Sequence, residues 1–241
     1  MTHNPVIIAL DFNNAAQARA MVDTLGDSVD FYKVGMELYA AEGIAFAREL
    51  VDRGKNVFLD LKLYDIGETV KRAVAVVARW GVRFLTVHGS KALLRAAIDG
   101  RGDANLKLLA VTVLTSFNEQ DLSDLGYETS VGDLVVLLAR AAVDCGVDGV
   151  VCSPLEAARV RQVVGRNMVL VTPGVRSRTA GAGDQKRIAT PAEAVAAGAD
   201  YLVIGRQVTR AANPKAEVEK IVAEIESQTP PHHSFSFGAL L

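Results

Sequence analysis

Apolar runs rich in β-branched residues recur eight times along this chain of 241 residues, each long enough for one buried strand. The runs lie at Val6–Leu10, Phe31–Val34, Val57–Leu59, Phe84–Val87, Leu106–Leu114, Gly149–Cys152, Val169–Thr172 and Tyr201–Ile204. Between them, apolar residues recur at helical spacing, as at Val70, Val74 and Val77. Glycines such as Gly26 and Gly146 follow the helical stretches, where a left-handed residue commonly ends a helix. The pattern therefore predicts alternating strands and helices.

Eight strand–helix units of roughly 30 residues each fit a parallel sheet that closes into a (β/α)8 barrel, the TIM barrel. An open doubly wound sheet is the alternative, but it would normally carry a glycine-rich fingerprint after its first strand. Here the letters LDFNNAA follow that strand instead. We therefore expect an α/β protein with one TIM barrel catalytic domain over residues 1–227.

The last stretch, residues 228–241, breaks the helical pattern with Pro230 and Pro231. Such a segment is expected to form an irregular C-terminal tail. His232 and His233 could bind a metal ion there, but a solvated tail accounts for them better.

Composition narrows the class of protein. Half of the residues are hydrophobic, enough for a large core, and the net charge of −2 favours neither nucleic acid nor an acidic membrane as partner. The two cysteines, Cys145 and Cys152, imply no disulfide framework and favour a reducing compartment. The letters MTHNPVIIALDF lack the features of a signal peptide, and no apolar run approaches the ~20 residues of a membrane span. We expect a cytoplasmic protein without a membrane partner.

Ionisable residues gather at the ends of the first three predicted strands. Asp11 follows the first strand, Lys33 lies in the second, and Asp60 and Lys62 end the third, with Asp65 just beyond. Because the carboxyl ends of the strands form the active face of such a barrel, these groups are expected to meet there. Asp60 and Lys62 are two positions apart on a strand and therefore share a face.

Two interpretations of these charges differ in function. A structural Asp60–Lys62 ion pair would account for two of them, although desolvation offsets most of the Coulomb gain of a buried pair. A shared functional cluster accounts better for alternating Asp and Lys residues from three successive strands. His88, at the end of the fourth strand, fits a backbone-bonded histidine as well as a catalytic one.

The seventh and eighth predicted strands are each followed by a glycine and an arginine. VTPGVRS places Gly174 and Arg176 after the seventh strand, and VIGRQVT places Gly205 and Arg206 after the eighth. Phosphate sites in these barrels are commonly built there from glycine N–H groups, and an arginine adds two-pronged hydrogen bonding. Two such pairs favour a phosphate site over solvated loop arginines. The loop of residues 177–189 could close over that site as a lid.

A metal site is not expected in this cluster. The ammonium groups of Lys33 and Lys62 already neutralise the carboxylates that would otherwise bind a divalent cation. The sequence has no HExxH or CxxC motif, and neither cysteine has a neighbouring His or Cys at ligand spacing.

Several motifs together resemble one enzyme family. LDLKLYDIGET resembles the DxKxxD signature of the orotidine 5′-phosphate decarboxylases. The resemblance extends through ALDF, YKVG, TVLTS, VTPGVR and YLVIGRQVT, and covers about residues 5–226 but not the tail. One departure lies between Asp65 and Thr69, where the family often has Pro-Asn and this chain has Gly67 and Glu68.

The resemblance implies decarboxylation of orotidine 5′-phosphate to UMP, the last step of pyrimidine nucleotide synthesis, without metal or cofactor. Lys62 would protonate the carbanion left at C6 of the pyrimidine, held by Asp60 and Asp65 near the substrate carboxylate. Lys33 would complete the charge network. The implied substrate-binding residues are Asp11 and Lys33 at the ribose, Thr115 at the pyrimidine, Arg206 at the phosphate and Gln185 bridging from the lid, together with Thr69, Pro173, Arg176 and Gly205. Asp65 and Thr69 would come from the second subunit of a homodimer with shared active sites.

Two rival functions share the same fold. Metal-dependent barrels of the hexulose-phosphate synthase type, which act on sugar phosphates, share the DxKxxD motif but have an acidic residue at the position of Lys33 to help hold Mg²⁺. Lys33 therefore argues against them. A catalytically inactive barrel that only binds a nucleotide is the other rival, and the intact Asp60, Lys62 and Asp65 disfavour it.

Overall fold

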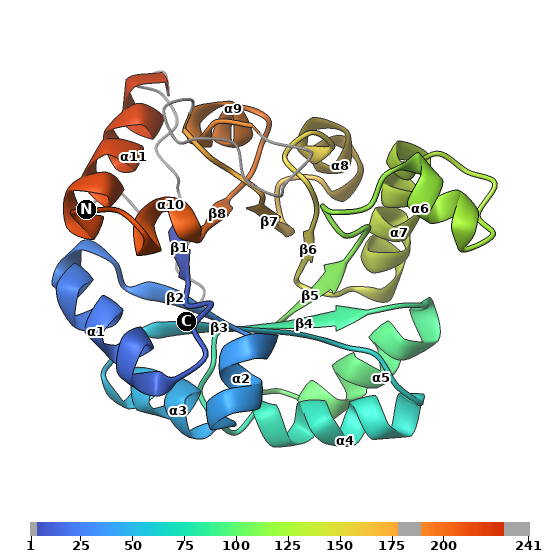
Figure 1. Cartoon of the computed structure of the whole chain (residues 1–241). Helices are drawn as coiled ribbons and strands as arrows, with labels where there is room; N and C mark the ends of the chain where they lie inside the picture. Colours follow the sequence, from blue (N-terminus) through green and yellow to red (C-terminus); the bar gives the residue numbers. More distant parts are fainter. Residues whose placement is uncertain (1–3, 178–188, 229–241) are drawn as a thin grey trace.

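The computed structural model describes residues 4–177 and 189–228, and within them eight parallel strands close into a barrel in sequence order (Figure 1). The strands are β1 (Val6–Ala9), β2 (Phe31–Gly35), β3 (Asn56–Leu63), β4 (Phe84–His88), β5 (Lys107–Val111), β6 (Gly149–Val151), β7 (Val169–Pro173) and β8 (Tyr201–Ile204). Each strand pairs with its neighbour in the sequence, and β1 pairs with β8 to close the sheet. The predicted (β/α)8 barrel is confirmed.

Two strands differ from the prediction by more than one residue at an end, and both differences affect the site. Strand β3 continues past Leu59 to Leu63, so Asp60 and Lys62 belong to the strand itself. Strand β5 ends at Val111 instead of reaching Leu114, so the residues that follow form a loop at the mouth of the barrel.

Helices connect the strands and form a ring outside the barrel (Figure 1). They are α1 (Ala15–Leu25), α2 (Met36–Glu42), α3 (Ala45–Asp52), α4 (Gly67–Val77), α5 (Lys91–Arg101), α6 (Glu119–Asp124), α7 (Val131–Cys145), α8 (Ala157–Val164), α9 (Pro191–Ala196), α10 (Arg206–Thr209) and α11 (Pro214–Gln228), with a short 3₁₀ helix η1 (Gly26–Ser28) after α1. Helix α9 begins at its proline behind a capping box in which Thr190 and Glu193 bond each other's backbone N–H groups.

Alternate strand residues fill two separate cores. One set faces outward and packs against the helices, where Tyr32, Leu59 and Leu85 are fully buried. The other set fills the inside of the barrel: Ile7, Ala9, Phe31, Phe58, Phe84, Leu109, Val151, Val169, Val171, Tyr201 and Val203. This division follows from the two-residue period of a strand that is buried on both faces.

Aromatic rings occupy much of the barrel interior. Phe84 packs against Phe31, Phe58 and Tyr201 with ring centroids 5.0, 5.9 and 5.3 Å away. Arg83 lies over the rings of Phe31 and Phe84 at 5.7 and 5.9 Å. Residues two positions further along several of these strands are polar or charged, so a ligand is expected at the carboxyl ends of the strands, above this apolar filling.

No helix in the described part of the chain is long and apolar enough to cross a membrane. The proposed lid residues 178–188 and the tail from residue 229 onward lie outside the described residues. Helix α11 runs to Gln228, and the predicted domain boundary at residue 227 stays a prediction.

Candidate active site

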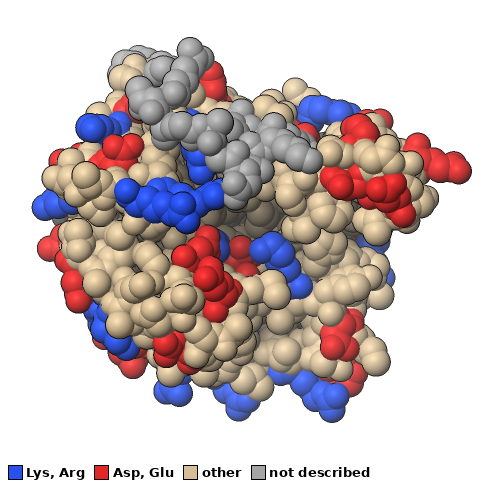
Figure 2. Space-filling model, viewed as in Figure 1, with Lys and Arg blue, Asp and Glu red and all other residues tan. Residues whose placement is uncertain are grey.

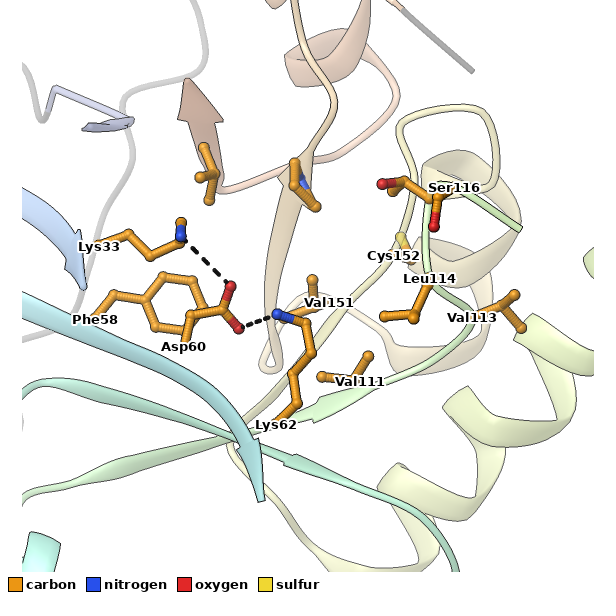
Figure 3. A pocket seen from close by; sticks show the side chains of 13 residues that line it. Lys33, Phe58, Asp60, Lys62, Val111, Val113, Leu114, Ser116, Val151 and Cys152 are labelled. Atoms are coloured by element: carbon orange, nitrogen blue, oxygen red, sulfur yellow. Dashed lines mark hydrogen bonds and ion pairs between the residues drawn. The ribbon is translucent and has the colours of Figure 1, made fainter. Parts of the chain in front are cut away.

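Asp60 lies between two lysines at the carboxyl ends of β2 and β3 (Figure 3). Its Oδ1 atom accepts a hydrogen bond from Lys62 Nζ at 2.9 Å, and its Oδ2 atom lies 3.8 Å from Lys33 Nζ. Lys33 Nζ also donates to Oδ1 of Asp11 at 2.9 Å. The structure therefore brings four of the predicted residues into one alternating chain of charges, Asp11–Lys33–Asp60–Lys62.

Burial increases towards the middle of this chain of charges. The side chains of Lys33 and Asp60 are 10% and 14% exposed, whereas those of Lys62 and Asp11 are 32% and 55% exposed. Removing one partner from a buried ion pair is strongly destabilising, because the other charge is left uncompensated. Two ammonium groups and two carboxylates balance here, so each of the inner charges is compensated.

Lys62 has an unusual backbone conformation. Its φ is 50°, the only positive φ of a non-glycine residue among residues 4–177 and 189–228. The pairing of β3 with β4 shifts register between Leu59 and Leu63, which marks an irregularity at Lys62. A left-handed conformation costs an L-residue about 1–2 kcal/mol, and such strain is concentrated at functional sites. A regular strand would place Asp60 and Lys62 on one face, whereas the two side chains meet across this irregularity.

Thr86 is a site residue that the sequence argument missed. It is fully buried in β4, and its hydroxyl donates to Asp60 Oδ1 at 3.0 Å. The Thr86 hydroxyl oxygen also accepts a hydrogen bond from the backbone N–H of Lys62 at 2.9 Å. The strand period could have identified Thr86. It lies two residues after the interior Phe84 and two before His88, and alternate residues of a strand share a face.

Gly35 is the second residue that the sequence argument missed. It ends β2 two positions after Lys33 and therefore lies on the same face of the strand. A Cβ atom at this position would lie 2.6 Å from Lys33 Nζ and 3.1 Å from Asp11 Oδ1. Because real Cβ atoms essentially never come that close, glycine is required here for the Lys33–Asp11 contact.

A cavity opens above Asp60 and Lys62. Its lining combines the two lysines and Asp60 with an apolar wall and with Thr115 and Pro173, two further predicted residues. The wall consists of Phe58, Val111, Val113, Leu114, Val151, Cys152 and Val203, with Ser116 at the edge (Figure 3). Figure 2 shows acidic and basic side chains close together around a hollow near the centre of this face. The cavity therefore combines charged groups from β2 and β3 with an apolar wall.

Asp65 and Thr69 are not brought into this cavity by their own chain. Both are exposed, and the Asp65 carboxylate accepts a hydrogen bond from the N–H of Ile66 at 2.6 Å. Within residues 4–177 and 189–228, Asp65 forms no ion pair. The neighbouring Tyr64 and Ile66 are 71% and 75% exposed.

The predicted phosphate residues follow β7 and β8. Gly205 precedes α10, and a Cβ atom added there would meet Asp11 Oδ2 at an ordinary 3.9 Å, so Gly205 adjoins the chain of charges. Arg206 is the first residue of α10 and is partly buried. The N–H of Arg176 donates to the carbonyl of Ala189 at 3.0 Å. Gln185 lies outside the described residues.

His88 is the last residue of β4 and is partly buried. Burial, and secondarily the nearby Lys62 ammonium, lower the pKa of His88 below its ordinary value. The ring of Tyr64 meets the imidazole edge-on, with centroids 5.7 Å apart. The neutral imidazole is therefore the favoured form beside Lys62 near pH 7.

Comparison with known proteins gives a consistent result. A family model described as "Orotidine 5′-phosphate decarboxylase / HUMPS family" matches residues 4–221. The orotidine 5′-phosphate decarboxylase of Rhodopseudomonas palustris (strain HaA2) is 55% identical over 220 residues, which is 91% of this chain and 94% of the relative. That of Nitrobacter winogradskyi is 50% identical over 231 residues, 96% of each chain.

A solved structure agrees with these relatives. The crystal structure of orotidine 5′-phosphate decarboxylase from Lactobacillus acidophilus is similar at a TM-score of 0.82 and 38% identity, covering 92% of this chain and 99% of that one. Family model, relatives and structure all span nearly the whole barrel. The chain therefore belongs to the orotidine 5′-phosphate decarboxylase / HUMPS family.

Proposed function

We propose that this protein decarboxylates orotidine 5′-phosphate to UMP, the last step of pyrimidine biosynthesis, without metal or cofactor. The observation that carries the proposal is the Lys33–Asp60–Lys62 arrangement at the cavity floor. Relatives named orotidine 5′-phosphate decarboxylase support it, because they are 50–56% identical over most of this chain.

The proposed reaction needs one proton donor. The bond between C6 and the carboxylate carbon breaks, its electron pair stays on C6, CO2 leaves, and Lys62 Nζ delivers a proton to C6. The lysine then regains a proton from water. An ammonium held by its own carboxylate at 2.9 Å stabilises charge developing on C6 without having to reorganise, and it is also the acid.

The rest of the cavity fits the rest of the substrate. The apolar wall suits a flat pyrimidine and the uncharged CO2 that leaves it. We assign Thr115 and Pro173 to the pyrimidine, and Asp11 and Lys33 to the ribose hydroxyls. Arg176, Gln185, Gly205 and Arg206 are assigned to the phosphate, a charge-assisted contact remote from the reacting carbon.

We further propose a homodimer in which each active site takes Asp65 and Thr69 from the partner. Support comes from the exposed position of both residues and from the apolar Tyr64 and Ile66 beside them. Apolar side chains exposed together commonly mark an interaction site. The prediction of a cytoplasmic location is supported by Cys145 and Cys152, both described residues, which form no disulfide.

The metal-dependent sugar-phosphate rival is disfavoured by Lys33, because its ammonium occupies the space between two carboxylates that a Mg²⁺ ion would need. A direct assay separates the two functions: purified protein is mixed with orotidine 5′-phosphate, and loss of its absorbance and release of CO2 are followed. We expect turnover that dialysis against EDTA leaves unchanged. Activity that disappears on dialysis and returns with Mg²⁺ would favour the rival, and absence of turnover would refute the proposal.

A further inference from the structure

The Thr86 hydroxyl contacts the two groups that define the position of Lys62. An amide N–H can only donate, so the hydroxyl oxygen accepts from the Lys62 backbone at 2.9 Å. An ionised carboxylate can only accept, so the hydroxyl proton goes to Asp60 Oδ1 at 3.0 Å. Thr86 is fully buried, so water does not replace either contact.

These contacts form a closed ring of hydrogen bonds that includes the proton donor, Lys62. Asp60 Oδ1, which accepts from Thr86, also accepts from Lys62 Nζ at 2.9 Å. Thr86 therefore fixes the Lys62 backbone directly. It also orients Asp60 Oδ1, the oxygen that accepts from the Lys62 ammonium. Lys62 has a left-handed backbone conformation at the register shift between β3 and β4. Such a conformation persists only when surrounding contacts hold it, so the hydrogen bond between Thr86 and the backbone matters.

We propose that Thr86 is a positioning residue for the decarboxylation: it holds the Lys62 backbone in its left-handed conformation and aims Asp60 at the Lys62 ammonium. The inference rests on the proposed function for its catalytic consequence, but its structural part stands independently. Thr86 itself does not line the cavity and has no contact with substrate in this role.

Thr86→Val is the informative variant, because it keeps the shape and the β-branch of the side chain and removes only the hydroxyl. A hydrogen bond to a charged group is lost, and we expect kcat to fall about 10- to 150-fold. KM should change little, because the substrate-binding groups stay in place. Thr86→Ser restores the hydroxyl and should recover most of kcat.

Thr172→Val is the matched control. Thr172 is also a fully buried strand threonine, but its hydroxyl donates to the carbonyl of Tyr201 at 3.4 Å, away from the charges. We expect its kcat to stay near the wild-type value. Wild-type kcat in Thr86→Val, or equal losses in Thr86→Val and Thr86→Ser, would overturn the proposal.

A measurement that needs no turnover tests the structural part. Hydrogen exchange of the Lys62 amide, followed by NMR, should be slow in the wild type and in Thr172→Val, and faster in Thr86→Val. Exchange in the wild type at the rate of an unprotected amide would refute the Thr86 contact even if Thr86→Val does not fold. If the wild type fails to decarboxylate orotidine 5′-phosphate, the proposed function fails, while slow Lys62 exchange would still support the positioning role.

Discussion

Lys62 Nζ lies 2.9 Å from Oδ1 of Asp60, a residue two positions earlier on the same strand. The pair lies inside the barrel mouth instead of on the surface, and Asp60 keeps a second ammonium, that of Lys33, at 3.8 Å. If Lys62 were removed, Asp60 would keep one ammonium partner, that of Lys33, which it shares with Asp11. Lys62 can therefore be substituted while Asp60 keeps an ion-pair partner inside the barrel.

Lys62→Ala should fold normally and lose nearly all activity. Loss of a general acid costs about 10²–10⁴-fold and loss of charge stabilisation a further 10²–10³-fold, so we expect at least about a 10⁴-fold drop in kcat. Lys62→Arg should fail as well, because a guanidinium is a poor acid at neutral pH. Steady-state kinetics and thermal unfolding followed by circular dichroism check this. A well-folded Lys62→Ala protein with near-normal kcat would contradict the assignment.

Gly35→Ala should reduce activity with little loss of stability. The new methyl group would meet the mobile end of Lys33 at 2.6 Å, so the lysine moves away from Asp11 while the backbone is retained. Loss of this charge-assisted contact is expected to lower kcat/KM about 10-fold or more. Gly132→Ala is the control, because its methyl would meet the end of Arg159 at 2.8 Å, outside the site. If both variants keep full activity, the spacing at Gly35 does not matter for function.

Arg206→Ala should weaken the binding of nucleotides but not of nucleosides. A charge-assisted contact to phosphate contributes about 1.5–3 kcal/mol, so UMP should bind about 10- to 150-fold more weakly, whereas uridine should be nearly unaffected. Calorimetric titration of both ligands measures this, with the exposed Arg210→Ala as control. Equal losses for UMP and uridine would argue against a phosphate role.

Mixing two inactive variants tests the shared active site. Lys62→Ala and Asp65→Ala subunits should each be nearly inactive as homodimers. In a heterodimer one site collects both defects and the other is intact, so up to half of the wild-type activity per heterodimer should return. Heterodimers purified with two affinity tags that stay at the activity of the parents would mean that Asp65 serves its own chain.

His88 should make stability depend on pH below about 6.5, the ordinary pKa of histidine. Burial and Lys62 lower the pKa of His88 in the folded protein, so the unfolded chain takes up this proton first as the pH falls. Stability is therefore lost as the pH drops from the unfolded pKa towards the lower folded one. Tm of the wild type minus Tm of His88→Asn should decrease between pH 7.5 and pH 5.5. A constant difference would show that His88 titrates alike in both states.

The sequence by itself determined the barrel and most of the charges at its mouth. A period of two along eight apolar runs specifies which residues face the interior, and Asp11, Lys33 and Asp60 follow interior residues in phase. Because parallel strands bring their carboxyl ends to one edge, the chain of charges could be predicted without coordinates.

Only the tertiary structure decided how that chain of charges is held. Thr86 and Lys62 are 24 positions apart, and their contact depends on the register shift between β3 and β4. The need for glycine at position 35 depends on where the Lys33 ammonium ends, which is set by Asp11 on a different strand. A local sequence pattern indicates which residues of a strand share a face. It does not specify the register between strands or the space between side chains. Register places Thr86 in the site, and side-chain spacing requires glycine at position 35.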